Sequence, residues 1–197
     1  MSEILVNTIK KADGTGSITV PAETGTVLTS ASSIPVANLD SAVGITEVDI
    51  WKITTAKSGT GFLTANWERV TDDGAGYLGT GMTESSGVFT FPSTGIWRID
   101  APATMYRSNG NEYYVGYEIY TSTDGTNYDS AAKSQGSVTY IAATNVFESA
   151  YCTFIFDVTN TSTHKVKFHF LEQNDGTIEG STNKLMTGGI FTRLGDT

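Results

Sequence analysis

Apolar and polar residues alternate along most of the chain beyond residue 45, with the period of two that is typical of half-buried strands. In GIWRIDAPATMY, Trp97 and Ile99 alternate with Arg98 and Asp100, and HKVKFHF shows the same pattern. Asp-Gly pairs, which tolerate positive φ in tight turns, separate such runs at 73–74, 124–125 and 175–176. The pattern predicts an all-β protein of short antiparallel strands around one closed core, which means a sandwich or a jelly roll.

Several predicted strands are apolar on both faces, and EYYVGYEIY and AYCTFIFDV are the clearest examples. A small sandwich covers one face of each sheet by itself, so we expect another subunit to cover the second face. The large aromatic side chains are therefore predicted to lie in the core or at an interface between subunits. They are Trp51, Phe89, Trp97, Tyr113, Tyr117, Phe168, Phe170 and Phe191.

The first 45 residues differ from the rest because they contain no Phe, Tyr or Trp and are rich in Gly, Ser, Thr and Ala. So little apolar bulk cannot offset a backbone ordering cost of about 1 kcal/mol per residue. We therefore predict an extended attachment arm over 1–45 and a jelly-roll head over 46–197. The apolar positions expected to dock the arm, by adding short strands to a partner sheet, are Ile4, Leu5, Val6, Ile9, Ile18, Val20, Val27 and Leu28.

The formal charge of −9 argues against nucleic acid and anionic membranes as partners. The N-terminal MSEILVNTIKK lacks the pattern of a signal peptide, and no run approaches the roughly 18 apolar residues of a membrane span. We expect synthesis in the cytoplasm and no membrane insertion. The single cysteine, Cys152, lies in an apolar run and is interpreted as a buried hydrophobe.

No catalytic constellation, metal site or cofactor motif is predicted, so we expect a protein that is not an enzyme. His164 and His169 are expected to be solvated, because each is a lone histidine on the polar face of a strand. Neither has a Cys, Asp or second His at strand spacing that would make a metal site. The acidic pairs Asp72/Asp73 and Asp124/Asp129 suit either calcium or a turn, and the turn is favoured. The tyrosines of EYYVGYEIY suit either a glycan platform or packing, and packing is favoured.

Two segments resemble the superfamily of tumour necrosis factor and the complement globular heads. GVFTFPSTGIWRI is similar to its Gly-x-Phe-x-x-Pro-x-x-Gly-x-Tyr-x-Phe signature, with Trp97 at the Tyr position and Ile99 at the second Phe. MTGGIFTRLGD resembles its final strand, at the centre of the inner sheet. The resemblance implies a jelly roll that assembles as a homotrimer about a three-fold axis, and it leaves open a calcium ion near that axis.

The segment VNTIKKADGTGSITVPAETGTVLTSASSIP is similar to N-terminal segments of structural proteins from tailed phages, marine and cyanobacterial ones in particular. This resemblance implies a virion protein of the capsid-decoration or head-fibre type, on the virion surface and docked to capsid or tail proteins. Its exposed loops are then available for host attachment to a surface glycan or protein. The alternatives are the receptor-binding head of a tail fibre and a free lectin-like module.

Overall fold

The computed structural model describes residues 8–10, 17–19, 44–107, 110, 112–139, 141–142 and 144–197. The chain divides between Val43 and Gly44 into two compact units. In the first unit, β1 (Thr8–Lys10) and β2 (Ser17–Thr19) form an antiparallel pair in which Ile9 lies opposite Ile18. The other predicted arm positions lie outside the described residues.

The second unit is built from strands that contain the predicted alternating runs. They are β3 (Val48–Ile53), β4 (Lys57–Ser58), β5 (Gly61–Phe62), β6 (Trp67–Arg69), β7 (Thr83–Ser85), β8 (Val88–Thr90), β9 (Gly95–Arg107), β10 (Glu112–Ser122), β11 (Asp129–Val138), β12 (Val146–Val158), β13 (Lys165–Glu172), β14 (Thr177–Ile178) and β15 (Gly188–Gly195). No helix that could cross a membrane occurs in the part of the chain that the structure describes.

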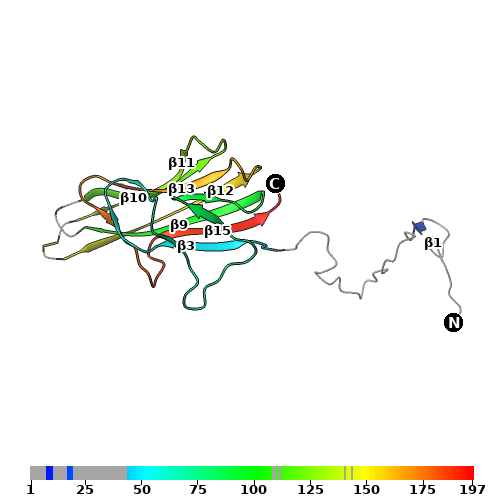
Figure 1. Ribbon diagram of the computed structural model, residues 1–197, viewed down its shortest axis with the longest axis horizontal. Coiled ribbons are helices and arrows are strands. Elements are labelled where there is room, and N and C mark those ends of the chain that lie inside the picture. The colour runs from blue at the N-terminus through cyan, green and yellow to red at the C-terminus, as the bar shows by residue number, and fades with distance from the viewer. Residues whose placement is uncertain are drawn as a thin grey trace. The chain divides into compact units, whose positions relative to one another are not determined.

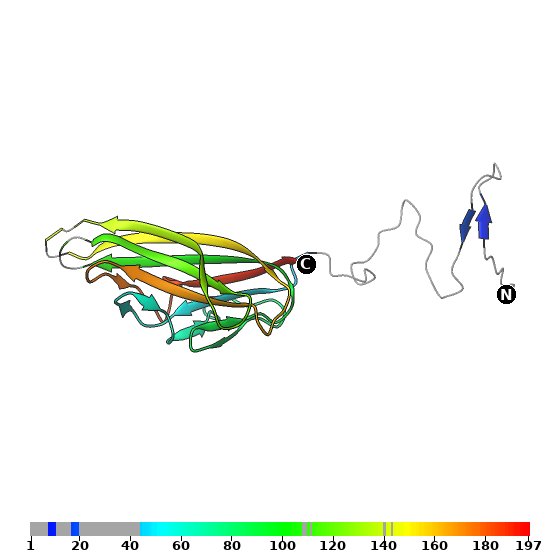
Figure 2. The same ribbon diagram turned by 90° about the horizontal axis from the view of Figure 1, so that it is seen from above.

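These strands form two antiparallel sheets. One has the order β11-β10-β13-β8-β7, with β5 also paired to β13. The other has the order β4-β14-β9-β15-β3-β6, with β12 paired along the whole of β9. Figure 1 shows β10, β11 and β13 in one layer and β3, β9 and β15 in the other, and Figure 2 shows the long strands running lengthwise through the unit. We call them the six-stranded and the seven-stranded sheet.

The chain changes sheet at most of its long connections. It passes from β8 in the six-stranded sheet to β9 in the seven-stranded sheet, returns for β10 and β11, and crosses again for β12, β13 and β14. Antiparallel sheets that exchange strands in this way make a jelly roll. The prediction of an all-β jelly roll is therefore confirmed.

Aromatic side chains fill the space between the sheets. Phe89 lies within 5.1 to 5.6 Å, between ring centroids, of Trp51, Phe168 and Phe191, and Trp67 lies 4.9 Å from it. Edge-to-face pairs of this kind add stabilisation beyond the apolar area that they bury. The core thus joins β8 and β13 of one sheet to β3, β6 and β15 of the other.

The sequence 87–97 turns the chain from β8 into β9. Phe91 before the corner packs on Trp97 after it, with ring centroids 5.1 Å apart, and the Trp97 indole N–H donates to the carbonyl of Ser93. Gly87 adopts a φ of +78°, and a Cβ there would lie 2.2 Å from the carbonyl oxygen of Leu63. The aromatics at this corner therefore hold the two sheets together, and only glycine fits at its start.

Two of the three predicted Asp-Gly turns have the expected backbone. Asp73 and Gly74 have φ of 54° and 84°, and Gly125 has 82°. Gly176 differs, because its φ is not in the left-handed region. A Cβ there would lie 2.9 Å from Val115 Cγ1, so this glycine is required by close packing and not by a turn.

Buried charged side chains are paired within the chain. The Glu112 carboxylate accepts hydrogen bonds from the backbone N–H groups of Gln173 and Asn174 and from Arg107 Nη1, at 2.5, 2.8 and 2.6 Å. Burial raises the pKa of Glu112, but these donors outweigh burial, so that its pKa lies below the usual value. Lys52, which is fully buried, pairs with Asp72 at 2.7 Å.

Candidate self-association surface

The outward face of β9 and β12 carries large apolar side chains that nothing in the chain's described part covers. Alternate residues of β12 point away from the core, and among them Phe147, Tyr151 and Ile155 are 55%, 53% and 52% exposed. Single exposed apolar residues are ordinary, but a row of them on one sheet face marks an interaction site.

The register extends this row across neighbouring strands. Phe147 lies opposite Tyr106, with ring centroids 5.4 Å apart, and Tyr151 lies opposite Pro102. On the other side of β9, β15 adds outward-pointing residues, of which Leu194 is exposed. We call this set the β9/β12 face; its apolar members are Ile96, Pro102, Tyr106, Phe147, Tyr151, Ile155, Ile190 and Leu194.

A polar cluster interrupts the apolar surface at its middle. The Tyr151 hydroxyl donates to Asp100 Oδ1 at 2.5 Å, and Arg98 Nε lies 2.9 Å from Asp100 Oδ2. Arg98 Nη2 also donates to the Tyr151 hydroxyl at 3.3 Å. The hydrogen bond to Asp100 raises the pKa of Tyr151, and the hydrogen bond to Tyr151 raises the pKa of Arg98. Asp100 is 7% exposed, so its carboxylate is held in the sheet surface with its partners in place.

The sandwich of these two sheets is similar in fold to several solved structures. Eiger TNF from S. frugiperda aligns with a TM-score of 0.58 and 9% sequence identity, covering 79% of this chain and 96% of that one. Murine APRIL at pH 8.5 aligns with a TM-score of 0.52 and 13% identity, covering 75% and 98%. The fold is the TNF-like jelly roll. No protein-family model and no curated protein matches the sequence.

In this TNF-like fold, most of the predicted aromatic site residues lie in the core. Phe89, Trp97, Tyr117, Phe168, Phe170 and Phe191 are buried, and Trp51 is half-buried against Phe89. Tyr113 is different, because it is 71% exposed at the start of β10. The residues of the β9/β12 face were not among the predicted site residues.

The two acidic pairs, for which the sequence favours turns over calcium, include carboxylates that make contacts within the chain. The Asp124 carboxylate accepts hydrogen bonds from Ser122, Thr126 and Asn127 within its own turn, and the Asn127 amide is the main cause of its lowered pKa. Asp72 is bound to Lys52. Among the described residues, no group of three or more His, Cys, Asp or Glu side chains is arranged to hold a metal ion.

The expectation of two solvated histidines is wrong for His164. This residue is buried, stacks on Phe156 with centroids 5.3 Å apart, and contacts the hydroxyls of Thr159 and Thr163. It precedes β13 and lies in the turn, so strand alternation did not apply to it. His169 is half-buried, and its Nδ1 lies 2.9 Å from Glu118 Oε2.

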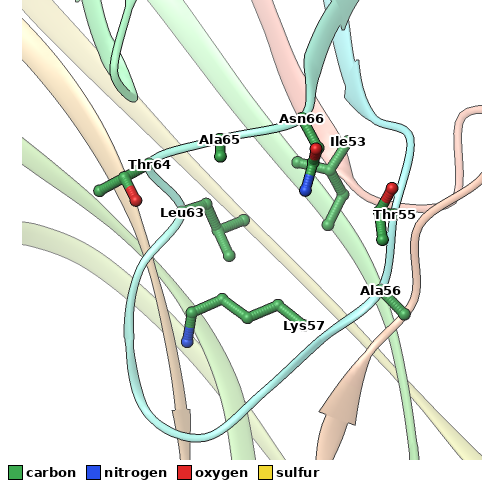
Figure 3. Close-up of a pocket in the computed structure, with 8 residues that line it drawn as sticks. All are labelled: Ile53, Thr55, Ala56, Lys57, Leu63, Thr64, Ala65 and Asn66. Atoms are coloured by element: carbon green, nitrogen blue, oxygen red, sulfur yellow. The ribbon is translucent and has the colours of Figure 1, made fainter.

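A cavity of about 230 Å³ lies between the end of β3 and the segment 54–66 (Figure 3). The buried side chains of Ile53 and Leu63 line it, together with the stem of Lys57, whose ammonium donates to the carbonyl of Gly59. Desolvation lowers the pKa of Lys57. This volume is below the roughly 300 to 1,000 Å³ of typical small-molecule pockets. Compared with this cavity, the β9/β12 face is therefore the stronger candidate for a functional site.

Proposed function

We propose that the protein is a homotrimeric structural protein in which the jelly-roll unit associates through the β9/β12 face. The observation that carries this proposal is the row of half-exposed apolar side chains at Phe147, Tyr151 and Ile155. Closed symmetric assembly covers such a face in every copy at once. The resemblance of GVFTFPSTGIWRI to a superfamily of trimeric heads supports three as the number of copies.

We further propose that this trimer is an appendage of a tailed-phage particle, of the capsid-decoration or head-fibre type. The support is the resemblance of the N-terminal segment to those of phage structural proteins, together with the separate unit that residues 1–43 form. In this account the N-terminal unit binds capsid or tail proteins, and the jelly roll is displayed at the virion surface. No catalytic step and no cofactor are required.

Complementation of a phage that lacks the gene tests the attachment role. The full chain with Ile18→Asp is compared with the full chain carrying Thr19→Asp, since both positions lie in β2. We expect Ile18→Asp to be poorly incorporated into purified particles and Thr19→Asp to be incorporated normally, because alternate side chains of an added strand set its register. Normal incorporation of both variants would place docking elsewhere in the chain.

A glycan-binding module is the second candidate, either as a tail-fibre head or as a free lectin-like protein. The observation that favours it is an aromatic group on the outer surface of the six-stranded sheet. Phe62, Tyr120 and His169 lie with ring centroids 5.0 to 5.4 Å apart, and Lys167 lies over the rings of Phe62 and Tyr128. Binding of the full chain to a glycan array, lost in Tyr120→Ala, would favour this role.

A further inference from the structure

The β9/β12 face carries charged side chains at only a few of its outward positions. Along β9, β12 and β15 these are Arg98, Asp100 and Asp157. Arg98 and Asp100 neutralise each other within one copy. Asp157 is exposed, and its carboxylate forms no ion pair or hydrogen bond with any described residue of its own copy. Among the described residues, the face therefore holds one carboxylate without a partner.

Arg98 has hydrogen-bonding capacity that its own copy does not use. A guanidinium has five N–H donors. In Arg98, Nε donates to Asp100 and Nη2 donates to the Tyr151 hydroxyl. Its Nη1 group has no acceptor among the described residues. The side chain is 48% exposed, so water satisfies these donors in a single copy. Covering the face by a second copy removes that water and requires a new acceptor.

Asp157 and Arg98 are near each other on the face but do not pair within a copy. Asp157 lies opposite Ile96, and Ile155 lies opposite Arg98, so the two charged residues are diagonal neighbours. Arg98 turns instead to Asp100, two residues further along β9. Each copy thus offers one cation with unused donors and one anion without a partner at nearly the same place.

We propose that Arg98 of one copy pairs with Asp157 of the next copy, and that this contact fixes how the copies align. The inference rests on the self-association proposed above. In a closed ring of three, each copy gives its Arg98 to one neighbour and its Asp157 to the other, so every charge is paired. Apolar contacts of Tyr151 and Ile155 supply affinity, and the charge pair specifies the register, as charge complementarity does at other interfaces.

A double-mutant cycle on the full chain tests the pair. The dissociation constant of the assembly is measured by sedimentation for wild type, Arg98→Met, Asp157→Asn and the double variant. We expect each single variant to raise the dissociation constant by about tenfold or more. The dissociation constant of the double variant should be no higher than that of the single variant that associates more weakly. Asp157→Glu, which keeps the charge, should remain close to wild type.

Controls separate this inference from the proposed function. Asp129→Asn removes an aspartate from the six-stranded sheet and should leave association unchanged. If Arg98→Met fails to fold, the association of Asp157→Asn is compared with that of wild type at low and at high salt. Only the association of the wild type should weaken with added salt, because only the wild type keeps the charge pair. If the wild type is a trimer but the fold-changes in dissociation constant caused by Arg98→Met and Asp157→Asn multiply in the double variant, the two residues do not interact. That result would overturn the charge pair and leave the self-association intact. A monomeric wild type would overturn both the pair and the self-association.

Discussion

Trp97 is the largest fully buried side chain among the described residues, and it closes the corner between the two sheets. Trp97 contacts Phe91, and Phe91 in turn packs on Phe156 and Phe191. Removing the Trp97 ring therefore leaves a cavity between β8, β12 and β15. We expect Trp97→Ala to lower the free energy of unfolding by about 3 to 5 kcal/mol, measured by urea denaturation. Ile141→Ala, at an exposed position, should change it by less than about 0.5 kcal/mol. Similar stability of the two variants would contradict the structural role of Trp97.

The free energy of unfolding should depend on pH through the Glu112 carboxylate. Its folded-state pKa lies below its ordinary value, so its contribution is complete above about pH 4.5 and is lost as the pH falls through the folded-state pKa. We expect Glu112→Gln to be less stable than wild type at neutral pH by about 1.5 to 3 kcal/mol. The difference should shrink as the pH falls below the ordinary pKa of the carboxyl group. Urea denaturation at several pH values measures it, and a difference that does not change with pH would contradict this account.

Cys152 should be unreactive in the folded protein. It lies on the core side of β12, and burial raises the pKa of its thiol to about 11. Because the thiolate is the reactive form, a disulfide reagent at about pH 8 should label it slowly in the native state and promptly after unfolding. Rapid labelling of the native protein would show that β12 opens or that the cysteine is accessible.

At the scale of the strand, the sequence of β12 predicts a strand but not which of its faces points into the core. AYCTFIFDV is apolar at both odd and even positions, so the pattern alone cannot say which set of residues is buried. The structure places Cys152 and Phe156 inside and Tyr151 and Ile155 outside. Pairing with β9, which lies about fifty residues earlier in the chain, decides this, and a local pattern holds no record of such pairing.

Two exposed isoleucines offer a matched test of the β9/β12 face. Ile155 is 52% exposed on β12, and Ile141 is 57% exposed in the loop before that strand. We expect Ile155→Lys to shift the protein toward monomer, because it places a charge in an apolar contact, and Ile141→Lys to have no effect. Light scattering after size-exclusion chromatography measures both. Equal behaviour of the two variants would mean that the copies do not meet at this face.

At the scale of the whole molecule, the sequence was sufficient for the fold. The alternating strands predicted a sandwich or a jelly roll, because apolar periodicity and turn residues are local signals. The resemblance of GVFTFPSTGIWRI to a superfamily signature favoured the jelly roll. Alternation could not predict the polar cluster of Arg98, Asp100 and Tyr151. Its members come from two strands and meet only through the register. The assembly and the attachment role of the N-terminal segment stay predictions.

We expect three copies of the chain to associate through the β9/β12 face. Sedimentation equilibrium at micromolar concentration measures the mass of the full chain in solution. A trimer gives a single species at three times the chain mass of 21.0 kDa. A species that stays at 21.0 kDa across the concentration range would contradict it.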